Sequence, residues 1–498
     1  MTGSLAAVTG TSAASIGSSG KSRGREHVIG PRLSWSGTTW RDDDAKAAPP
    51  ILPHERIGAT SGDTHRFVFG DALDVAHALA DEGLRGKVDL VYLDPPFASR
   101  ADYVHEVRLD GRADGRVRRV LAYEDSTDIA PYLEDLAPRL RALVALLSPS
   151  GTIWVHLDWR AAYLVRVLLD ELVGRDRFLN EIVWRRAPNL GRQAASHQFG
   201  RTLDTLIVYG GKDAKLVPPT RLEPIEPSAI RFDDEGRPFT TAPRGDYTDA
   251  SIARLETEGR VHRTATGKVY IKYFLEKDAS GTWCRARRVD ALWTDVPPLR
   301  HVAVSERTGY PTQKPRALLE RIITSATPKG GLVVDLFSGS GTTAEAAHVT
   351  GRRAIVGDRG PVALATTRAR MLRAGAPLSI DTCGTTPPVV RGDGAVRVRV
   401  TTGARNEVSV SLLRPREPLA WSVARRTDRD VVVLAHSERG LGASAAPVAD
   451  VLAFDGRGVA GDLVVRVHED DGTVRECDVA LTNGRAGRST SRSEGVPS

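Results

Sequence analysis

The sequence has few cysteines and no long apolar run. Its three cysteines, Cys284, Cys383 and Cys477, are far apart and form no C-x-x-C pair, so neither a disulfide framework nor a cysteine zinc site is supported. No stretch of about 18 apolar residues, enough to span a bilayer, occurs. The N-terminal segment lacks the apolar central run of a signal peptide. We expect a chain that is neither secreted nor membrane-spanning, and a reducing cytoplasm fits these absences.

The excess of positive charge is small. Lys and Arg number 69 against 62 Asp and Glu, which gives a formal net charge of +7. Arginine supplies most of the cations, and this mildly favours a polyanionic partner. A solvated, arginine-rich surface explains the charge equally well. The 41% of hydrophobic residues in 498 positions is enough for the cores of about two or three domains.

Apolar runs alternate with amphipathic stretches through much of the chain. The apolar runs that predict strands are RFVFG, VDLVYL, GTIWVHL, EIVWRR, TLIVYG, GLVVDLF and RRAIVGD. The amphipathic stretches that predict helices lie near Ala72–Glu82, Tyr132–Leu147, Ala161–Val173, Pro315–Ala326, Thr342–Val349 and Val362–Leu372. Strands that alternate with helices predict an α/β fold, in which a mostly parallel sheet of seven strands is covered on both faces.

Composition divides the chain further. Residues 1–60 are rich in Ser, Gly, Thr and Ala and are expected to form a disordered leader. Residues 187–293 break the alternation over a span too long for a loop, so we expect an inserted domain between two core halves at 61–186 and 294–375. Residues 376–482 predict a small β-rich C-terminal domain, in which DLVVRVHEDDGTVRECDVAL is a hairpin that turns at Asp471 and Gly472. A basic, disordered tail is expected at 483–498.

A glycine-rich turn follows the predicted strand GLVVDLF. Gly339, Gly341 and Ala344 satisfy the pattern G-x-G-x-x-A before a helix, so the backbone can approach a ligand at the positive end of that helix. Asp358, at the tip of the next strand, is placed to hold both hydroxyls of a ribose. Asp335, before the turn, suits an amino-acid ammonium better than a pyrophosphate. The segment therefore predicts a site for a cofactor that contains a nucleoside.

The predicted strand VDLVYL ends in a carboxylate, two prolines and an aromatic ring. Pro95 and Pro96 fix the backbone after Asp94, so the carboxylate and a backbone carbonyl can aim two hydrogen-bond acceptors at one target. The exocyclic amino group of a nucleobase offers two N–H donors, and its nitrogen becomes positive during alkylation. Phe97 offers a flat face to a base that has left the duplex. We expect this motif and the glycine turn to face one crevice, because both strands should end at the same sheet edge.

These motifs together resemble a known family. DPPF and DLFSGSGTT, in this order along the chain, are similar to the β class of amino-directed DNA methyltransferases, which use S-adenosyl-L-methionine. GYPTQKPRALLERII, FLNEIVWRR and ALWTDVPP also resemble modification subunits of type III restriction systems and their solitary relatives. The resemblance covers roughly Phe67 to Met371. It implies a seven-stranded methyltransferase sheet with circularly permuted motif order, in which the inserted domain recognises the target sequence.

The resemblance also implies roles for single residues. Asp71 would contact the cofactor adenine, Asp358 would hold the ribose, and Lys314 would lie beside the pocket. The residues that would wrap the methionine portion are Phe337, Gly339, Gly341 and Thr342. Cytosine-N4 members usually begin the catalytic motif with Ser, so Asp94 favours adenine N6 as the target. Phe97 departs from the Tyr that adenine-modifying members more often carry, and it keeps the stacking face without the hydroxyl.

Double-stranded DNA is the partner that the resemblance implies, with a restriction subunit or a second copy of the chain as further partners. The arginines expected to contact phosphates, where the chain enters the insertion, are Arg185, Arg186, Arg192 and Arg201. The loop VRLDGRADGRVRRV, after the catalytic motif, is a second candidate for contact with the DNA backbone. Either set could instead be a solvated surface. Binding to DNA would associate a cytoplasmic protein with the nucleoid.

Several alternatives remain open at this level. Asp71 could cap the helix that begins at Ala72, and Lys314 could be a surface lysine in a first helical turn. His156 and Asp158 are interpreted as structural, because this chemistry requires neither a metal nor a proton shuttle. The chain could also be a cytosine-N4 enzyme, a non-catalytic DNA-binding module that keeps a methyltransferase fold, or an enzyme that acts on RNA.

Overall fold

The computed structural model describes most of the chain. The described residues are 47–58, 65–97, 101–108, 117–125, 128–188, 197, 199–391, 395–402, 407–414, 420–428, 430–438, 449–455, 463–469 and 471–479. Residues 1–46 of the predicted leader, the predicted tail at 483–498, Arg192 and the middle of the loop after the catalytic motif lie outside these ranges.

Seven neighbouring strands form the core sheet, and they are the seven that the sequence predicts. In spatial order they are β7 (Phe178–Arg185), β8 (Leu203–Gly210), β6 (Leu147–Leu157), β3 (Val88–Leu93), β16 (Leu332–Asp335), β17 (Arg353–Asp358) and β2 (His65–Phe69). Neighbours are parallel, except that β8 runs antiparallel to both β6 and β7. The predicted α/β class with a mostly parallel sheet is confirmed.

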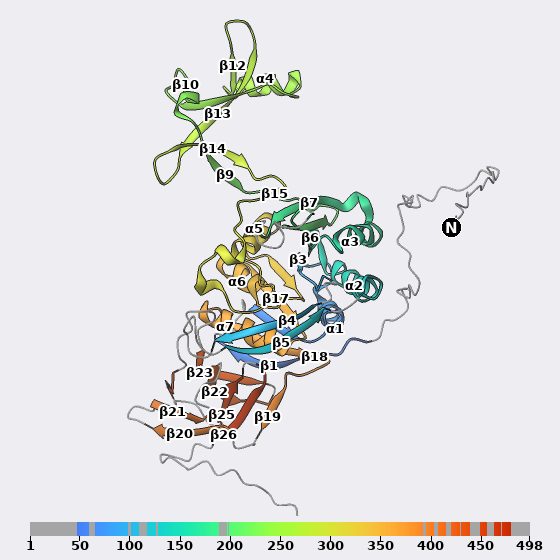
Figure 1. Cartoon of the computed structure of the whole chain (residues 1–498), viewed down its shortest axis with the longest axis vertical. Helices are drawn as coiled ribbons and strands as arrows, with labels where there is room; N and C mark the ends of the chain where they lie inside the picture. The colour runs from blue at the N-terminus through green and yellow to red at the C-terminus, as the bar shows by residue number, and fades with distance from the viewer. Residues whose placement is uncertain are drawn as a thin grey trace, which may run out of the picture.

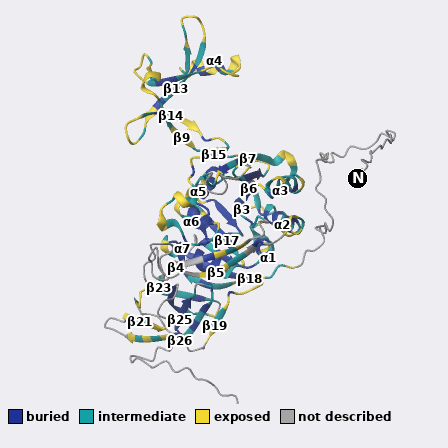
Figure 2. Ribbon diagram, in the orientation of Figure 1, coloured by how far each residue is buried: buried dark blue, intermediate teal, exposed yellow. Residues whose placement is uncertain are grey.

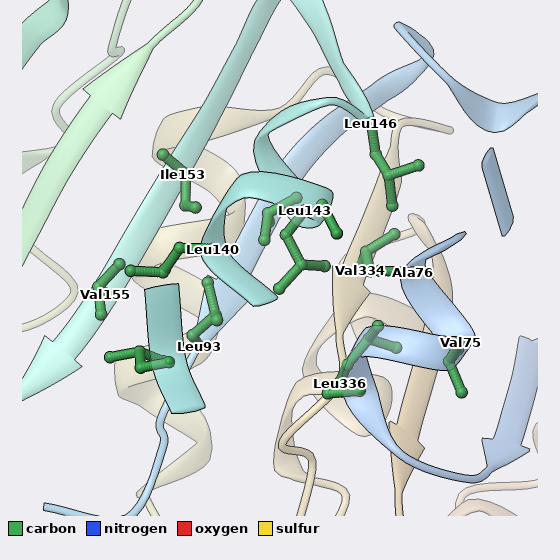
Figure 3. Packing of buried hydrophobic residues seen from close by; sticks show 14 of the residues in the cluster. Val75, Ala76, Leu93, Leu140, Leu143, Leu146, Ile153, Val155, Val334 and Leu336 are labelled. Carbon is green, nitrogen blue, oxygen red and sulfur yellow. The ribbon is translucent and has the colours of Figure 1, made fainter. Parts of the chain in front are cut away.

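Helices cover both faces of this sheet, as the alternation of buried side chains along β3 requires. Val91 and Leu93 point to one face and pack with helices α1 (Ala72–Leu79), α2 (Ile129–Val144) and α3 (Ala162–Leu169). Leu90 and Tyr92 point to the other face and pack with α5 (Arg316–Ala326), α6 (Thr342–Val349) and α7 (Pro361–Arg373). Figure 3 shows part of the first face, where Leu140 of α2 lies beside Leu93.

Two further strands extend the core sheet and correct two predicted boundaries. Strand β18 (Leu378–Cys383) pairs in parallel with β2, and β1 (Ile51–Ile57) pairs antiparallel with β18. Residues 51–57 were expected in the disordered leader, and residues 378–383 in the C-terminal domain. Both segments instead belong to the sheet, because each finds its hydrogen-bonding partner far away in the sequence.

The insertion forms a separate sheet that projects from the core (Figure 1). Its elements are β9 (Thr220–Pro224), β10 (Arg231–Phe232), β11 (Pro238–Pro243), α4 (Asp249–Thr257), β12 (Val261–Arg263), β13 (Val269–Lys277) and β14 (Trp283–Arg288). The predicted limits of 187–293 are too wide. Strand β8 lies inside them but belongs to the core sheet, and β15 (Leu292–Trp293) pairs with β7.

The C-terminal segment is rich in strands and joins the core sheet directly. Its strands are β19 (Val389–Arg391), β20 (Arg397–Thr402), β21 (Glu407–Arg414), β22 (Ala420–Arg426), β23 (Val431–Glu438), β24 (Val451–Asp455), β25 (Leu463–His468) and β26 (Val474–Val479). Strand β23 pairs with β1, which makes one continuous path of 15 strands. The predicted hairpin is confirmed: β25 and β26 are antiparallel, and Gly472 in the turn between them has φ +81°.

A hairpin that the sequence did not predict follows the catalytic motif. It consists of β4 (Ala101–Arg108) and β5 (Val117–Asp125), which are antiparallel. Figure 2 shows that the central strands of the core are largely buried, whereas the insertion is mostly exposed or half-buried. Within the described ranges, no helix is both long and apolar enough to cross a membrane.

Candidate active site

Four aspartates lie at the carboxyl edge of four neighbouring parallel strands. Asp94 follows β3, Asp335 ends β16, Asp358 ends β17, and Asp71 follows β2. All four line one cavity of about 570 Å³, together with Gly339 of the glycine turn. The two motifs that the sequence places far apart therefore meet in one crevice, as expected.

The two carboxylate oxygens of Asp94 have different surroundings. Oδ2 accepts a hydrogen bond from Nζ of Lys314. Oδ1 is buried and has no hydrogen-bond partner among the described residues. Lys314 is itself only 9% exposed, and its Nζ also donates to the carbonyl of Thr312 over 3.3 Å. The alternative that Lys314 is a surface lysine is therefore wrong.

The rest of the catalytic motif surrounds Asp94. Pro96 lines the cavity, whereas Pro95 and Phe97 are not among the lining residues. The backbone N–H of Phe97 donates to Asp125 of β5 over 3.1 Å, which ties the motif to the hairpin. The ring of Phe97 lies 26° from parallel to the ring of His156, with 6.3 Å between centroids. One face of Phe97 is thus directed at a protein ring.

His156 belongs to a buried polar chain beneath this motif. Its Nδ1 lies 2.9 Å from the Tyr92 hydroxyl, and its Nε2 lies 3.2 Å from Oδ2 of Asp204. Asp204 also pairs with Nε of Arg186 over 2.7 Å. His156, Tyr92 and Asp204 are all nearly inaccessible to solvent. The contacts agree with a structural interpretation of His156, and Asp158 pairs with its neighbour Arg160.

Glycine is required at both turn positions, because each has a positive φ and close neighbours. Gly341 has φ +74°, and an added Cβ would lie 2.6 Å from Oγ1 of Thr367. Gly339 has φ +46°, and an added Cβ would lie 3.0 Å from the ring of Tyr310. Thr342 begins α6, and its hydroxyl donates to the Lys314 carbonyl over 3.2 Å. The turn therefore holds the segment that presents Lys314 to Asp94.

Asp335 and Asp358 are carboxylates in surroundings that disfavour negative charge. Burial raises the pKa of Asp335 to about 7, although hydrogen bonds from Thr343 and from the Phe337 N–H oppose the change. Burial also raises the pKa of Asp358, despite hydrogen bonds from the Gly339 and Gly360 backbone. Phe337 lines the cavity too. A cation bound in this cavity would relieve the penalty on both carboxylates.

Asp71 caps a helix and also lines the cavity. Its Oδ1 accepts the N–H of Leu73 over 2.9 Å, which confirms the capping alternative. Its Oδ2 accepts from Arg139 of α2 over 2.7 Å. Burial acts to raise the pKa of Asp71, but the hydrogen bond and charge of Arg139 outweigh it and lower the pKa. The proposed contact with a cofactor adenine is compatible with these bonds and stays a prediction.

Several residues of the cavity wall were not found from the sequence. Tyr123 of the β4–β5 hairpin lines the cavity, and its hydroxyl lies 3.0 Å from Oγ1 of Thr312. Thr312 has φ +59°, the one positive φ at a non-glycine residue in the described part of the chain. Tyr310 and Arg139 also line the cavity. The stretch VRLDGRADGRVRRV, residues 107–120, was read as a loop because it carries no regular apolar alternation.

The arginines proposed to contact DNA have different environments. Arg185 is exposed at the end of β7. Arg186 is held by Asp204, so its guanidinium already has an internal partner. Arg201 lies over the indole ring of Trp159 at 3.8 Å, and Trp159 is 47% exposed. Arg192 lies outside the described residues. Contact of these side chains with phosphates stays a prediction.

The fold and the cavity together define a class of enzyme. A strand-tip carboxylate with a buried, unpartnered oxygen faces a glycine turn across one cavity, and further carboxylates favour a cation there. S-Adenosyl-L-methionine carries a positive sulfonium, an amino-acid ammonium and a ribose, so the lining fits it. The arrangement is that of an S-adenosyl-L-methionine-dependent methyltransferase.

A family model identifies the chain more closely. The model of the N6_N4_Mtase family, described as DNA methylase, matches residues 88–366. The chain therefore belongs to this family of DNA methylases, which modify adenine N6 or cytosine N4 with S-adenosyl-L-methionine as the methyl donor. The matched span contains both motifs and the insertion, and it ends before the C-terminal strands.

Curated relatives and solved structures are similar over part of the chain. The chain is 28% identical over 363 residues to the type II methyltransferase M.EcaI of Enterobacter cloacae. The aligned region covers 68% of this chain and 73% of that protein. The chain is 24% identical over 339 residues to the StyLTI Mod subunit, a type III restriction-modification enzyme subunit of Salmonella typhimurium, covering 60% of this chain and 52% of the relative. The chain thus spans about half of that second relative.

Among solved structures, the M1.HpyAVI–SAM complex is 16% identical and covers 61% of this chain and 98% of that one, with a TM-score of 0.35. The cytosine-N4-specific PvuII DNA methyltransferase is also 16% identical, covers 65% of this chain and 89% of that one, and has a TM-score of 0.34.

Proposed function

We propose that this chain transfers a methyl group from S-adenosyl-L-methionine to N6 of adenine in double-stranded DNA, at a specific sequence, after the base leaves the helix. The observation that supports the proposal most strongly is the state of Asp94. One of its oxygens accepts a hydrogen bond from Lys314, and the other is buried without a hydrogen-bond partner among the described residues, in a side chain that lines the cavity. A buried carboxylate oxygen without a donor is costly, so this position favours an incoming N–H group.

The roles of the catalytic residues follow from this geometry. Oδ1 of Asp94 would accept one N–H of the target amine and stabilise the positive charge that develops on its nitrogen. Lys314 anchors the other oxygen, so that the carboxylate cannot rotate away from the base. The proline pair keeps the backbone fixed, and Phe97 would contact the flipped base. Transfer would form the N–C bond as the S–C bond breaks, and the methylated amine would then lose a proton to solvent.

The cofactor would occupy the cavity between the glycine turn and the strand tips. When bound, S-adenosyl-L-methionine supplies an electrophilic methyl group on its sulfonium. Asp335 and the turn at Gly339 would hold the amino-acid end, and Asp358 would accept from the ribose hydroxyls. Asp71 would contact the adenine end. The carboxylates and the cavity that they share support this assignment.

Adenine is favoured over cytosine because the catalytic motif begins with Asp rather than Ser. The projecting insertion would read the target sequence, and the exposed Arg185 would contact phosphates near its base. The relation to type III modification subunits supports a restriction subunit as a partner, and a second copy of the chain is a further partner that we propose.

Identification of the methylated base tests the proposal. Genomic DNA amplified in vitro carries no modification and offers every short sequence. After incubation with the purified chain and isotope-labelled S-adenosyl-L-methionine, the DNA is digested to nucleosides for mass spectrometry. We expect the label in N6-methyldeoxyadenosine, and sequencing of the modified positions would give the recognised site.

Each alternative has its own result in this assay. Label only in N4-methyldeoxycytidine would overturn the choice of adenine. Label in RNA but not in duplex DNA would make RNA the substrate. Tight binding to DNA without incorporation of label would indicate a non-catalytic module.

A further inference from the structure

Helix α7 holds the glycine turn in place from one side. The hydroxyl of Thr367 donates to the Gly339 carbonyl over 3.3 Å, and Nε of Arg370 donates to the Ser340 carbonyl over 2.8 Å. At Gly341 the turn packs so closely that an added Cβ would lie 2.9 Å from Cα of Thr367. A small shift of α7 would therefore move the backbone of the turn.

The N-terminal end of α7 also forms part of the cavity wall. The helix begins at Pro361, directly after Gly360, and both Gly360 and Arg359 line the cavity. The Gly360 N–H donates to Oδ1 of Asp358 over 2.8 Å. The position of α7 thus affects both ends of the cofactor site, the glycine turn and the strand tip at Asp358.

The C-terminal strands contact α7 at this same end. The β25–β26 turn lies against the start of the helix, where an added Cβ on Gly472 would be 2.4 Å from the backbone carbon of Pro361. A contact of this kind leaves no space for any side chain at residue 472. The C-terminal segment therefore sets how far Pro361 can move.

A buried ion cluster fixes the middle of α7 to the C-terminal strands. Arg368 of α7 donates to Oε1 of Glu55 over 2.9 Å, and Arg466 of β25 lies 3.0 Å from Oε2 of the same carboxylate. Arg466 also pairs with Glu476 of β26 over 3.2 Å. The four side chains are at most 5% exposed. Breaking one partner of such a cluster leaves a buried charge without compensation, so the cluster resists displacement of α7.

We propose that the C-terminal strands position the cofactor site through α7, by holding the helix against the glycine turn. The strands lie beyond the span matched by the methylase family, and none of their described residues lines the cavity. Their role in this proposal is to preorganise the turn before the cofactor binds. The proposal rests on the cofactor site described under the proposed function.

A pair of glycine variants tests this coupling in the full-length chain. Gly472→Ala adds a methyl group against Pro361, whereas Gly86→Ala adds one in open space before β3. The two glycines have φ +81° and +71°, so the backbone strain of an alanine is similar in both variants. Affinity for S-adenosyl-L-methionine is measured by calorimetry, and kcat is measured at saturating cofactor.

We expect Gly472→Ala to weaken cofactor affinity about fivefold to tenfold, with kcat at saturation little changed and the control near wild type. Equal affinities in the two folded variants would overturn the proposal. If Gly472→Ala does not fold, the cofactor affinity of Arg466→Gln, in the ion cluster, is compared with that of the Gly86→Ala control, and equal affinities would again overturn the proposal. A wild-type chain that binds no cofactor would refute the cofactor site itself, which is a different result from loss of the coupling.

Discussion

Asp335 is a buried acid in the wall of the cavity that we propose holds the cofactor, and its ionisation is expected to depend on what is bound. Its pKa is raised to about 7, first by burial and then by the charges of Asp94 and Asp358. A bound ammonium group favours the ionised form, since an opposite charge stabilises a carboxylate. Binding below pH 7 should therefore release a proton from Asp335.

The affinity for S-adenosyl-L-methionine should consequently rise with pH up to about 7 and weaken at lower pH, by up to about tenfold per pH unit. Calorimetry between pH 5.5 and 7.5, in two buffers with different enthalpies of ionisation, measures both the affinity and the released proton. Asp335→Asn should bind more weakly and lose the pH dependence. An affinity of the wild type that stays flat over this range would contradict the account of Asp335.

At the scale of elements, the β4–β5 hairpin and the segment before α5 close one side of the cavity. They meet where the Tyr123 hydroxyl contacts Thr312, a β-branched residue with positive φ. Such a conformation is costly and persists only where surrounding contacts hold it. Thr312 also accepts a hydrogen bond from Lys314, so the contact with the hairpin lies two residues from the partner of Asp94.

Removal of the Tyr123 hydroxyl should loosen this side of the cavity. One hydrogen bond contributes about 0.5–1.5 kcal/mol, so Tyr123→Phe should speed cofactor dissociation about 2–10-fold in stopped-flow experiments. The matched comparison is Thr312→Ala, alone and combined with Tyr123→Phe. In a double-mutant cycle the second change should add little to the first. Full additivity of the two effects would show that the pair does not act together.

The helices and strands that could be predicted from the sequence are those marked by residues within the element itself or directly beside it. Helix α6 was predicted with its observed bounds, because Gly341 marks its start and buried alanines recur along it. Strand β18 was missed, since its sequence LSIDTC places an aspartate among buried positions. Asp381 is stable there because Arg66 and Arg56 pair with it, and both come from strands early in the chain. Partners so distant in sequence leave no local pattern.

The same reason limits what could be predicted of the site. The shared location of the four aspartates could be predicted, because each lies at or just after the end of a predicted parallel strand and such strands end at the same edge of a sheet. The ion pair between Lys314 and Asp94 does not, because it depends on how the segment before α5 folds back over the sheet. The ion pair between Arg186 and Asp204 could not be predicted from the sequence either, so Arg186 was interpreted as a cation available to DNA.

At the scale of the whole molecule, one sheet of 15 strands joins β3, β16 and β17 to five of the C-terminal strands, β19, β22, β23, β25 and β26, whereas β20, β21 and β24 form a separate sheet. The insertion projects from the end of the core opposite to the C-terminal strands (Figure 1). Under the two proposals, the reading of DNA and the support of the glycine turn fall to opposite ends of the molecule. The central claim is that segments distant in the chain meet so that Asp94 faces the amine while the glycine turn holds the cofactor.

One paired measurement on the full-length chain tests this claim most directly. Methyl transfer to DNA and affinity for S-adenosyl-L-methionine are measured for wild type, for Asp94→Asn and for the control Asp176→Asn, whose side chain is 80% exposed. We predict that Asp94→Asn lowers transfer at least about 100-fold and leaves cofactor affinity nearly unchanged, while the control matches wild type in both. Transfer by Asp94→Asn at the wild-type rate would contradict the account.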